Sequence, residues 1–457
     1  MLLQNVEWDQ ALIEKYNTAR PRYTSYPTAL EFRPDFTETE FSAAARRYPN
    51  RPLSLYLHIP FCHQLCYFCG CNKVVTRHPQ KAEHYVQRLM LELRQRASLF
   101  SQRLLTQVHF GGGTPTFLSD QQLAEVMAVI RHEFRLDDDA EISLELDPRQ
   151  FSVERLTQLR QIGFNRLSMG VQDFDPVVQQ RVNREQDEGQ ITQLIVAMKR
   201  LGFTSTNIDL IYGLPRQTAE SFQYTLQRVL ALRPDRLSVF NYAHMPELFA
   251  AQRKIKSHEL PNAAEKLKIL QQSISQLQAG GYQFIGMDHF ALPTDELAQA
   301  QQAGRLHRNF QGYTTQHETD LLGVGVSAIS MIGETYSQNE KALNEWSRRI
   351  DEVGYALARG ISLSAEDILR RDIIKTLMCQ FSLSFASIEA VLKQPFTDYF
   401  AQELQLLSPM VEDGLLTVSA EGLEVSAKGR LLVRHICACF DQYSRQRMMQ
   451  QSFSRVI

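Results

Sequence analysis

The chain has 457 residues, 44% of them hydrophobic, and a formal net charge of −2. This length can bury a barrel-sized core and a second domain, and the balanced charge argues against nucleic acid or an anionic membrane surface as the main partner. The N-terminal residues lack the basic and apolar segments of a signal peptide, and no apolar run reaches the roughly 20 residues that cross a membrane. We therefore expect a cytoplasmic protein that binds neither nucleic acid nor membranes.

Strand and helix patterns alternate along the first half of the chain. A polar arm with aromatic residues precedes them, and its prolines Pro21 and Pro27 disfavour helix. Six segments then have the pattern of strands, with helical patterns between them: 53–59, 106–110, 141–146, 165–171, 207–212 and 236–242. Repeated strand–helix units predict an α/β fold with a parallel sheet covered by helices. Six units exceed a small doubly wound fold and fall short of an eight-unit barrel, so we expect a partial or complete (β/α) barrel.

The pattern changes from about residue 290 onward. A glycine-rich segment at 322–329 comes first, helical patterns follow at about 364–378 and 398–411, and residues 416–425 alternate as a hairpin does. Helices with a hairpin predict a smaller, mainly helical, winged-helix-like C-terminal domain. The expected division of the chain is an N-terminal arm (1–50), a barrel core (51–290), a barrel extension and connection (291–360) and the C-terminal domain (361–457).

Four of the seven cysteines lie within ten positions, and three of them, Cys62, Cys66 and Cys69, have the spacing C-x3-C-x2-C. An odd number clustered in this way does not indicate a disulfide framework. Iron–sulfur clusters are held by Cys thiolates, and a cubane normally takes four. Three thiolates leave one iron with an open coordination position, and catalytic metal sites likewise keep one position open. The spacing therefore predicts a [4Fe–4S] cluster on these three residues.

A structural zinc site is the alternative for the cysteine loop. Cys66 and Cys69 have zinc spacing, and Cys71 or His63 could be a fourth ligand. No second Cys/His pair follows at finger-like spacing, and a redox dithiol would need only two cysteines. The remaining cysteines are interpreted as small core residues: Cys379, Cys437 and Cys439.

Unusual residues follow the predicted strands. The cysteines follow the first strand, the glycines 111–113 the second, and Glu145, Gln172 and Asp209 end the next three. In barrels the chemistry collects in the loops after the strands, so these residues are expected to meet. The glycines could instead form a tight turn or a phosphate loop, although no Lys follows them, and Glu145 could be a solvated loop acid.

At this point the sequence resembles a known family. The segment Tyr56-Leu57-His58-Ile59-Pro60-Phe61-Cys62, the cysteine spacing and Gly111-Gly112-Gly113-Thr114-Pro115 resemble the radical S-adenosylmethionine (SAM) enzymes. The resemblance extends over nearly the whole chain and is strongest to the oxygen-independent coproporphyrinogen III oxidases, or coproporphyrinogen dehydrogenases. The arm at 21–27, Cys71 and the segment 170–174 carry that finer resemblance.

The resemblance implies an oxidoreductase of the radical SAM type that acts on CH–CH groups under anaerobic conditions. A reduced [4Fe–4S] cluster would cleave SAM, and the resulting 5′-deoxyadenosyl radical would take a hydrogen from a propionate side chain. Loss of an electron and of carbon dioxide would leave a vinyl group. Two such events would convert coproporphyrinogen III into protoporphyrinogen IX in porphyrin and haem biosynthesis. The implied partners are this substrate and an electron donor such as a flavodoxin-type reductant, with the protein acting as a monomer and its arm lying over the active site.

The resemblance also implies cofactor-binding residues, and it assigns no catalytic side chain. The residues carried over are Tyr56, Phe68, Gly112, Gly113, Thr114, Glu145, Gln172, Arg184, Asp209, Ala243 and Ile329. Gln172, Arg184, Asp209 and Ala243 would line a site for a second SAM molecule. A salt bridge between Asp209 and Arg184 is the structural alternative. Tyr56 and Phe68 could equally be core aromatics, and His58 a structural histidine.

The main rival is a haem-binding chaperone with the same radical SAM fold. Such chaperones usually have an aromatic residue in place of Cys71, and they carry an adjacent His-Asn pair that Arg308 interrupts here, between His307 and Asn309. They also lack the arm at 21–27. We therefore favour the enzyme. A radical enzyme acting on RNA or peptide has little support in a chain that is not basic. Candidates for binding the propionates are Arg20, Arg22 and Arg33.

Overall fold

A computed structural model describes residues 6–149 and 151–447. The chain forms two compact units, each made of separate segments. We call them the sheet unit (Phe32–Leu270 and Glu318–Ser362) and the helical unit (Met1–Glu31, Gln271–His317 and Leu363–Ile457). The division into an N-terminal arm, a barrel core, a barrel extension and a C-terminal domain stays a prediction. No described helix is both long and apolar enough to span a bilayer.

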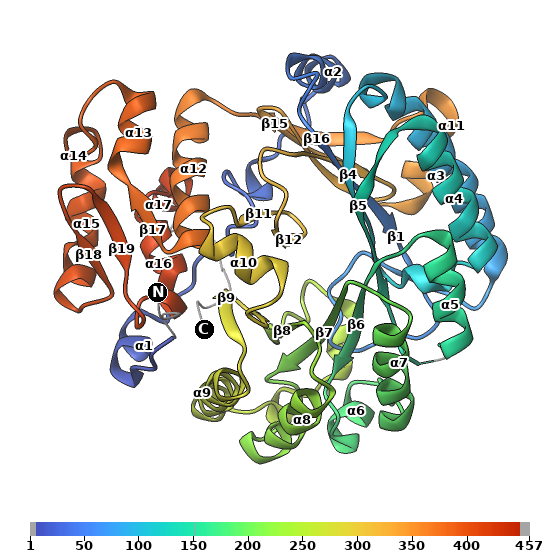
Figure 1. The fold of residues 1–457 in the computed structure, drawn as a ribbon, viewed down its shortest axis with the longest axis horizontal. Helices are drawn as coiled ribbons and strands as arrows, with labels where there is room; N and C mark the ends of the chain where they lie inside the picture. The colour runs from blue at the N-terminus through green and yellow to red at the C-terminus, as the bar shows by residue number, and fades with distance from the viewer. Residues whose placement is uncertain (1–5, 150, 448–457) are drawn as a thin grey trace. The chain divides into compact units, whose positions relative to one another are not determined.

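The sheet unit is built on parallel strands that follow one another across the sheet in chain order (Figure 1). These strands are β1 (Leu53–Ile59), β4 (Leu104–Gly112), β5 (Arg135–Leu146), β6 (Arg166–Gln172), β7 (Ser205–Tyr212) and β8 (Arg236–Asn241). Each pairs in parallel with the next. The predicted parallel sheet is therefore confirmed, with all six expected strands.

The sheet extends beyond β1 instead of closing on itself. The predicted glycine-rich segment begins with β13 (Asp320–Val324), which pairs in parallel with β1. Three antiparallel strands then complete this side: β14 (Ile329–Ile332), β15 (Thr335–Asn339) and β16 (Leu357–Ser362). The fold is thus a partial barrel.

Helices cover one face of this sheet (Figure 1). They are α3 (Pro79–Phe100), α4 (Asp120–Glu133), α5 (Val153–Ile162), α7 (Glu188–Arg200) and α8 (Ala219–Leu232). Helix α3 has a buried apolar side, in which Leu89 and Leu93 are fully inaccessible. Burial of each such side chain contributes about 1.5 to 3 kcal/mol. Ser119 caps α4 and forms a capping box with Gln122.

The helical unit contains the predicted C-terminal helices and hairpin. Its helices include α12 (Ala365–Gln380), α13 (Phe385–Leu392), α14 (Phe396–Tyr399), α15 (Ala401–Glu412) and α16 (Val433–Ala438). Strands β18 (Leu416–Val418) and β19 (Gly422–Val425) form the hairpin, and β17 (Ser382–Ser384) joins it. Phe385 stacks on Phe396, with ring centroids 4.1 Å apart. The three cysteines interpreted as core residues are buried.

The N-terminal arm, as far as residue 31, belongs to the helical unit. It begins with α1 (Gln10–Tyr16), which Asp9 caps. The buried Tyr23 donates its hydroxyl to Asp441 at 3.0 Å, and Arg434 Nε donates to the carbonyl oxygen of Pro21 at 2.9 Å. These contacts anchor the arm within its own unit; that it lies over the active site stays a prediction.

Candidate active site

A cavity of about 290 Å³ lies at the C-terminal ends of the parallel strands of the sheet unit. The four clustered cysteines line it together with eight of the residues carried over by resemblance: Phe68, Gly112, Gly113, Thr114, Glu145, Gln172, Arg184 and Asp209. Tyr56, Ala243 and Ile329 are not among its lining residues. The sheet therefore gathers most of the expected residues in one place, as its strand order requires.

The cysteine loop is fixed at both ends by backbone pairing. Strand β2 (Phe61–Cys62) pairs with β3 (Val74–Val75), so the residues before Cys62 and after Cys71 lie side by side. Thr76 N–H donates to the carbonyl oxygen of Cys62 at 3.0 Å. A loop closed in this way holds its thiols around one end of the cavity.

The arrangement of the thiols fits a cluster better than a zinc ion. Among residues 6–149 and 151–447, no three His, Cys, Asp or Glu side chains converge closely enough to hold one metal ion. A zinc site needs its ligand atoms about 2.0 to 2.3 Å from a single centre. In a cubane each thiolate bonds a different iron, so Cys62, Cys66 and Cys69 need only border a common space, as they do here.

Cationic donors converge on the sulfur of Cys66. Arg149 Nη2 and Arg184 Nη1 each lie 3.3 Å from Cys66 Sγ. Both arginines also pair with Asp147, at 2.6 and 3.2 Å. Burial opposes ionisation of Asp147, but the two guanidinium groups outweigh it and lower the pKa of this carboxyl to about 2. Asp147 therefore stays ionised and holds both arginines against the sulfur.

The other thiols have weaker donors. Thr114 Oγ1 lies 3.5 Å from Cys62 Sγ, and burial raises the pKa of that thiol to about 11. A hydrogen bond from Cys71 lowers the pKa of Cys69 to about 6. Cys71 is thus a hydrogen-bond donor to Cys69, a predicted cluster ligand. At Cys69 this donor favours the thiolate form that binds iron, whereas burial opposes it at Cys62.

The glycine run is packed against the protein itself. A Cβ on Gly113 would lie 2.7 Å from the carbonyl oxygen of Pro60, and one on Gly112 would lie 2.7 Å from the ring of His58. Gly112 also has a φ of +114°, which disfavours other residues. The packing of the loop itself therefore requires glycine at these two positions.

His58 is held as a neutral structural residue. Its Nε2 lies 3.0 Å from the carbonyl oxygen of Asn72, so this nitrogen carries the proton, and Nδ1 accepts from Tyr56 at 3.1 Å. Burial lowers the pKa of His58, consistent with the neutral ring. Tyr56 also stacks on His109, with ring centroids 5.8 Å apart. Both side chains thus have partners within the protein.

Glu145 presents a charged oxygen to the cavity. It accepts from His109 Nε2 at 3.2 Å and from Gly112 N–H at 3.3 Å. Burial opposes its ionisation, but the hydrogen bond from His109 prevails and the pKa of Glu145 is lowered. Its side chain remains 43% exposed. It is therefore an anion available to an ammonium group or to sugar hydroxyls.

Asp209 is a half-buried carboxyl with neutral hydrogen-bond partners. It accepts from Ser168 Oγ at 3.1 Å and from Asn207 Nδ2 at 2.8 Å. Burial and the nearby charge of Glu145 raise its pKa to about 6. Arg184 pairs with Asp147 instead, so the structure does not show the alternative salt bridge in this described region.

Two buried polar atoms at the cavity have no protein partner. They are Gln172 Oε1 and Arg184 Nε, and none of the described residues offers them a hydrogen bond. Gln172 has a φ of +70° and lies where the pairing of β6 with β7 shifts register. Buried polar atoms are nearly always bonded, so these two mark a place for a ligand.

Sequence reasoning missed part of this cavity. Asp147, Arg149, Lys73 and Ser168 line it but were not singled out. Asp147 and Arg149 immediately follow the third predicted strand, and this position was the available signal. Of the residues outside the lining, Ala243 lies two positions after β8 and Ile329 begins β14.

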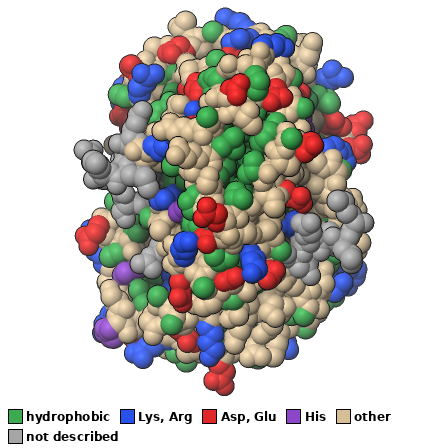
Figure 2. Space-filling model, turned by 90° about the vertical axis from the view of Figure 1, so that its left-hand side faces the viewer, with side chains coloured by type: hydrophobic (Ala, Val, Ile, Leu, Met, Phe, Trp, Pro, Cys, Tyr) green, Lys and Arg blue, Asp and Glu red, His purple; other side chains and the backbone are tan. Residues whose placement is uncertain are grey.

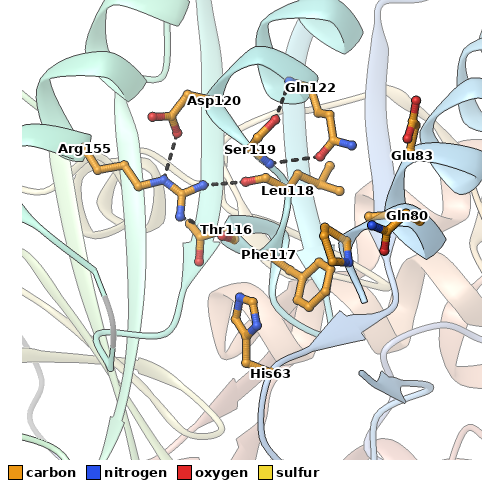
Figure 3. A pocket seen from close by; sticks show the side chains of 12 residues that line it. His63, Gln80, Glu83, Thr116, Phe117, Leu118, Ser119, Asp120, Gln122 and Arg155 are labelled. Atoms are coloured by element: carbon orange, nitrogen blue, oxygen red, sulfur yellow. Dashed lines mark hydrogen bonds and ion pairs between the residues drawn. The ribbon is translucent and has the colours of Figure 1, made fainter. Parts of the chain in front are cut away.

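A second pocket, of about 460 Å³, lies beside the cysteine loop (Figure 3). His63 packs against Phe117 there, with ring centroids 4.3 Å apart. Arg155 bonds Asp120 and the carbonyl oxygen of Thr116, both at 2.8 Å. Within the described part of the chain, no buried polar side-chain atom around this pocket lacks a partner. The cysteine cavity is therefore the stronger candidate.

Comparison with known proteins agrees with this geometry. The model of the Radical SAM superfamily matches residues 56–229, and that of the HemN C-terminal domain matches residues 363–432. An oxygen-independent coproporphyrinogen III oxidase of Salmonella typhimurium is 60% identical over 99% of each chain, and one of Pseudomonas aeruginosa is 47% identical over 100% of each.

A solved structure gives the same result for the fold. Coproporphyrinogen III oxidase (HemN) from Escherichia coli, described as a radical SAM enzyme, superposes with a TM-score of 0.93 at 58% identity. The match covers 96% of this chain and 100% of the other. The chain therefore belongs to the oxygen-independent coproporphyrinogen III oxidases, a family of radical SAM enzymes.

Proposed function

We propose that this protein converts two propionate side chains of coproporphyrinogen III into vinyl groups without oxygen, forming protoporphyrinogen IX. Relatives of the same family name at 60% identity over the full length support this activity. The observation that carries it is the cavity in which the cysteine loop meets the unpartnered groups of Gln172 and Arg184. Nothing in the comparisons favours a haem chaperone, and Arg308 separates His307 from Asn309 on β11 (His307–Asn309).

The cofactors would be a [4Fe–4S] cluster and SAM, which when bound supply the radical that removes hydrogen from the substrate. Cys62, Cys66 and Cys69 would hold the cluster. Arg149 and Arg184 would donate hydrogen bonds to the sulfur of Cys66 and keep its negative charge stabilised. The arginines stay in place because Asp147 pairs with both.

Two SAM molecules would share the cavity. Glu145 and the glycine run would serve the molecule on the cluster, since Glu145 is ionised and open to the cavity. Gln172, Arg184 and Asp209 would serve the second. Support comes from the unpartnered Gln172 Oε1 and Arg184 Nε, which a polar ligand would satisfy. Each propionate consumes one radical, so two molecules match the two events.

The proposal includes a flavodoxin-type electron donor and action as a monomer in the cytoplasm, without nucleic acid or membrane. All seven cysteines are free thiols, as a reducing compartment favours. On the face in Figure 2, basic and acidic side chains are interspersed, as the near-neutral net charge leads one to expect. Such a face lacks the large basic patch that would attract nucleic acid.

The test is an anaerobic assay of the reconstituted protein with coproporphyrinogen III, a reductant and SAM. We expect vinyl products by chromatography, and methionine released with them. The Cys66→Ala protein should form none, and Cys379→Ala, which changes a buried cysteine of the helical unit, should remain active. Absence of vinyl products from a protein with full cluster content would refute the proposed activity.

A further inference from the structure

His109 is held in one position by the register of three neighbouring strands of the sheet unit. It lies on β4, where it is paired with Tyr56 of β1 on one side and with Ser143 of β5 on the other. Its ring stacks on that of Tyr56 at an interplanar angle of 16°, and its side chain is 18% exposed. Glu145 follows Ser143 by two residues on β5 and therefore shares its face of the sheet.

Hydrogen bonds determine which nitrogen of His109 carries a proton. Nε2 lies 3.2 Å from Glu145 Oε1, and an ionised carboxylate can only accept, so Nε2–H is the donor. Nδ1 lies 2.6 Å from Ser143 Oγ, and in the neutral ring it accepts from that hydroxyl. The hydroxyl of Ser143 thus favours the form of the ring that donates to Glu145.

Each oxygen of Glu145 has one donor from the protein. Oε1 accepts from His109, and Oε2 accepts from Gly112 N–H at 3.3 Å. An ionised carboxylate can accept about four hydrogen bonds, so about two remain for a ligand. The side chain of Glu145 lines the cysteine cavity and is 43% exposed. The two protein donors fix the carboxylate and leave its other lone pairs to groups that enter the cavity.

Gly111 allows these side chains to pack together. A Cβ on this residue would lie 3.0 Å from both Glu145 Oε1 and Tyr56 Cε2, and 3.1 Å from His109 Nε2. These distances are shorter than the optimal separation of non-bonded atoms, so a side chain there would displace at least one of the three groups. The first glycine of the run therefore serves the contact between His109 and Glu145.

We propose that His109 is the positioning residue that holds the Glu145 carboxylate ready for SAM, with Ser143 fixing its ring. The inference deepens the proposed function and rests on it. An ammonium group or sugar hydroxyls of SAM would donate to the lone pairs that the protein leaves open. An acceptor that is already ordered binds such groups more tightly, because less conformational freedom is lost on binding.

The test measures SAM binding to the reconstituted, unreduced protein by equilibrium dialysis, without substrate. His109→Phe keeps a ring against Tyr56 but removes the donor, and it should weaken binding of one SAM molecule roughly tenfold. His109→Gln can place an amide N–H near the position of Nε2 and should recover part of the affinity. His132→Phe is the matched control and should bind SAM as the parent does, because His132 is 83% exposed on α4.

A double-mutant cycle distinguishes positioning from packing. In the Glu145→Ala protein, addition of His109→Phe should change the affinity less than about twofold, because His109 acts through that carboxylate. An equal loss in both backgrounds would overturn the inference, and so would equal binding by His109→Phe and His132→Phe. If His109→Phe takes up no cluster, Ser143→Ala decides, since weaker SAM binding supports the inference and unchanged binding contradicts it.

The assay for vinyl products separates this inference from the proposed function. A parent protein whose SAM binding depends on His109 but which forms no vinyl product would contradict the proposed function alone. A parent protein that forms vinyl products, with unchanged SAM binding in His109→Phe, would contradict the inference alone.

Discussion

The sulfur of Cys66 accepts hydrogen bonds from two guanidinium groups, those of Arg149 and Arg184. Hydrogen bonds to cluster sulfurs are one of the means by which a protein sets the reduction potential, because they stabilise the more negative, reduced state. Arg149 contacts the sulfur and Asp147 but is not among the residues assigned to SAM. Substitution of Arg149 therefore tests the contact with the sulfur without removing a residue of the SAM site, as substitution of Arg184 would.

Arg149→Met should lower the midpoint potential of the reconstituted cluster. Loss of one charge-assisted hydrogen bond predicts a shift on the order of 50 mV, measured by redox titration with electron paramagnetic resonance. Arg149→Lys keeps the charge and should recover part of the shift. An unchanged potential in Arg149→Met, at equal iron content, would show that this contact does not tune the cluster.

Asp209 gives a prediction on pH. Its pKa is raised to about 6 by burial and by Glu145, so the carboxyl is protonated below that pH and ionised above it. If the ionised form binds a cationic or hydroxyl group of the second SAM, affinity for that molecule should rise as pH increases from about 5 to about 7.

Equilibrium dialysis with the reconstituted, unreduced protein measures this effect. We expect the parent to bind about two equivalents of SAM at about pH 7. Asp209→Ala should bind about one equivalent at both about pH 5 and about pH 7, with the cluster spectrum unchanged. Glu145→Gln should reduce binding of the other molecule. One equivalent in both parent and Asp209→Ala would leave Asp209 a structural residue and contradict the two-molecule proposal.

Two glycines, Gly113 and Gly202, separate the effect of steric overlap from that of backbone strain. A Cβ on Gly113 would meet the carbonyl oxygen of Pro60 at 2.7 Å. Gly202 has a φ of +73°, but a Cβ there would meet nothing within 4 Å. The first position tests steric overlap beside the cysteine loop, and the second tests backbone strain alone.

Gly113→Ala should lower the melting temperature and the iron content after reconstitution, because Pro60 precedes the cysteine loop and must move. The expected loss of stability is about 1 to 3 kcal/mol. Gly202→Ala should cost about 1 kcal/mol and keep full iron content. Retention of the cluster in Gly113→Ala, at a melting temperature equal to that of Gly202→Ala, would show that the loop tolerates the overlap.

The sequence predicted elements well where the signal was local. The strand at 53–59 has the bounds of β1, and the cysteine spacing located the loop that follows it. Strand β5 begins at Arg135, earlier than expected. The prediction missed this part because Asp137, Asp138 and Asp139 are poor strand formers. Pairing of Arg135 with Leu104 of β4 holds this extension, and such pairing is not readable from composition.

The part of the site that was missed depends on contacts between distant residues. Arg149 reaches Cys66 across 83 positions, and Arg184 reaches the same sulfur across 118. Each arginine lies in a loop after a different strand, and only the order of the strands brings the loops together. The family resemblance supplied Arg184, whereas the only signal for Arg149 was its position after the third predicted strand.

Each unit collects segments from distant parts of the chain. In the helical unit, Tyr23 bonds Asp441 across 418 positions, and Arg434 bonds Pro21 across 413. The sequence predicted boundaries near residues 50, 290 and 360, where the pattern of strands and helices changes. The actual grouping follows the burial of side chains such as Tyr23 and Tyr26, at 4% and 2% exposure.

Deletion of residues 1–31 should therefore destabilise the helical unit. It removes two buried tyrosines, for which loss of a large aromatic side chain costs about 3 to 5 kcal/mol each, and it leaves Arg434 and Asp441 without partners from the arm. Calorimetry and limited proteolysis should show a lower melting temperature and earlier cleavage within residues 363–440.

The matched control is Tyr23→Phe, which removes only the hydroxyl that bonds Asp441 and should cost about 1 kcal/mol. The truncated protein should still bind iron, because the cysteine loop and its donors all belong to the sheet unit. Loss of the cluster on truncation would mean that the sheet unit depends on the arm. An unchanged melting temperature would mean that the helical unit folds without it, and that burial of Tyr23 and Tyr26 contributes far less than their exposure implies.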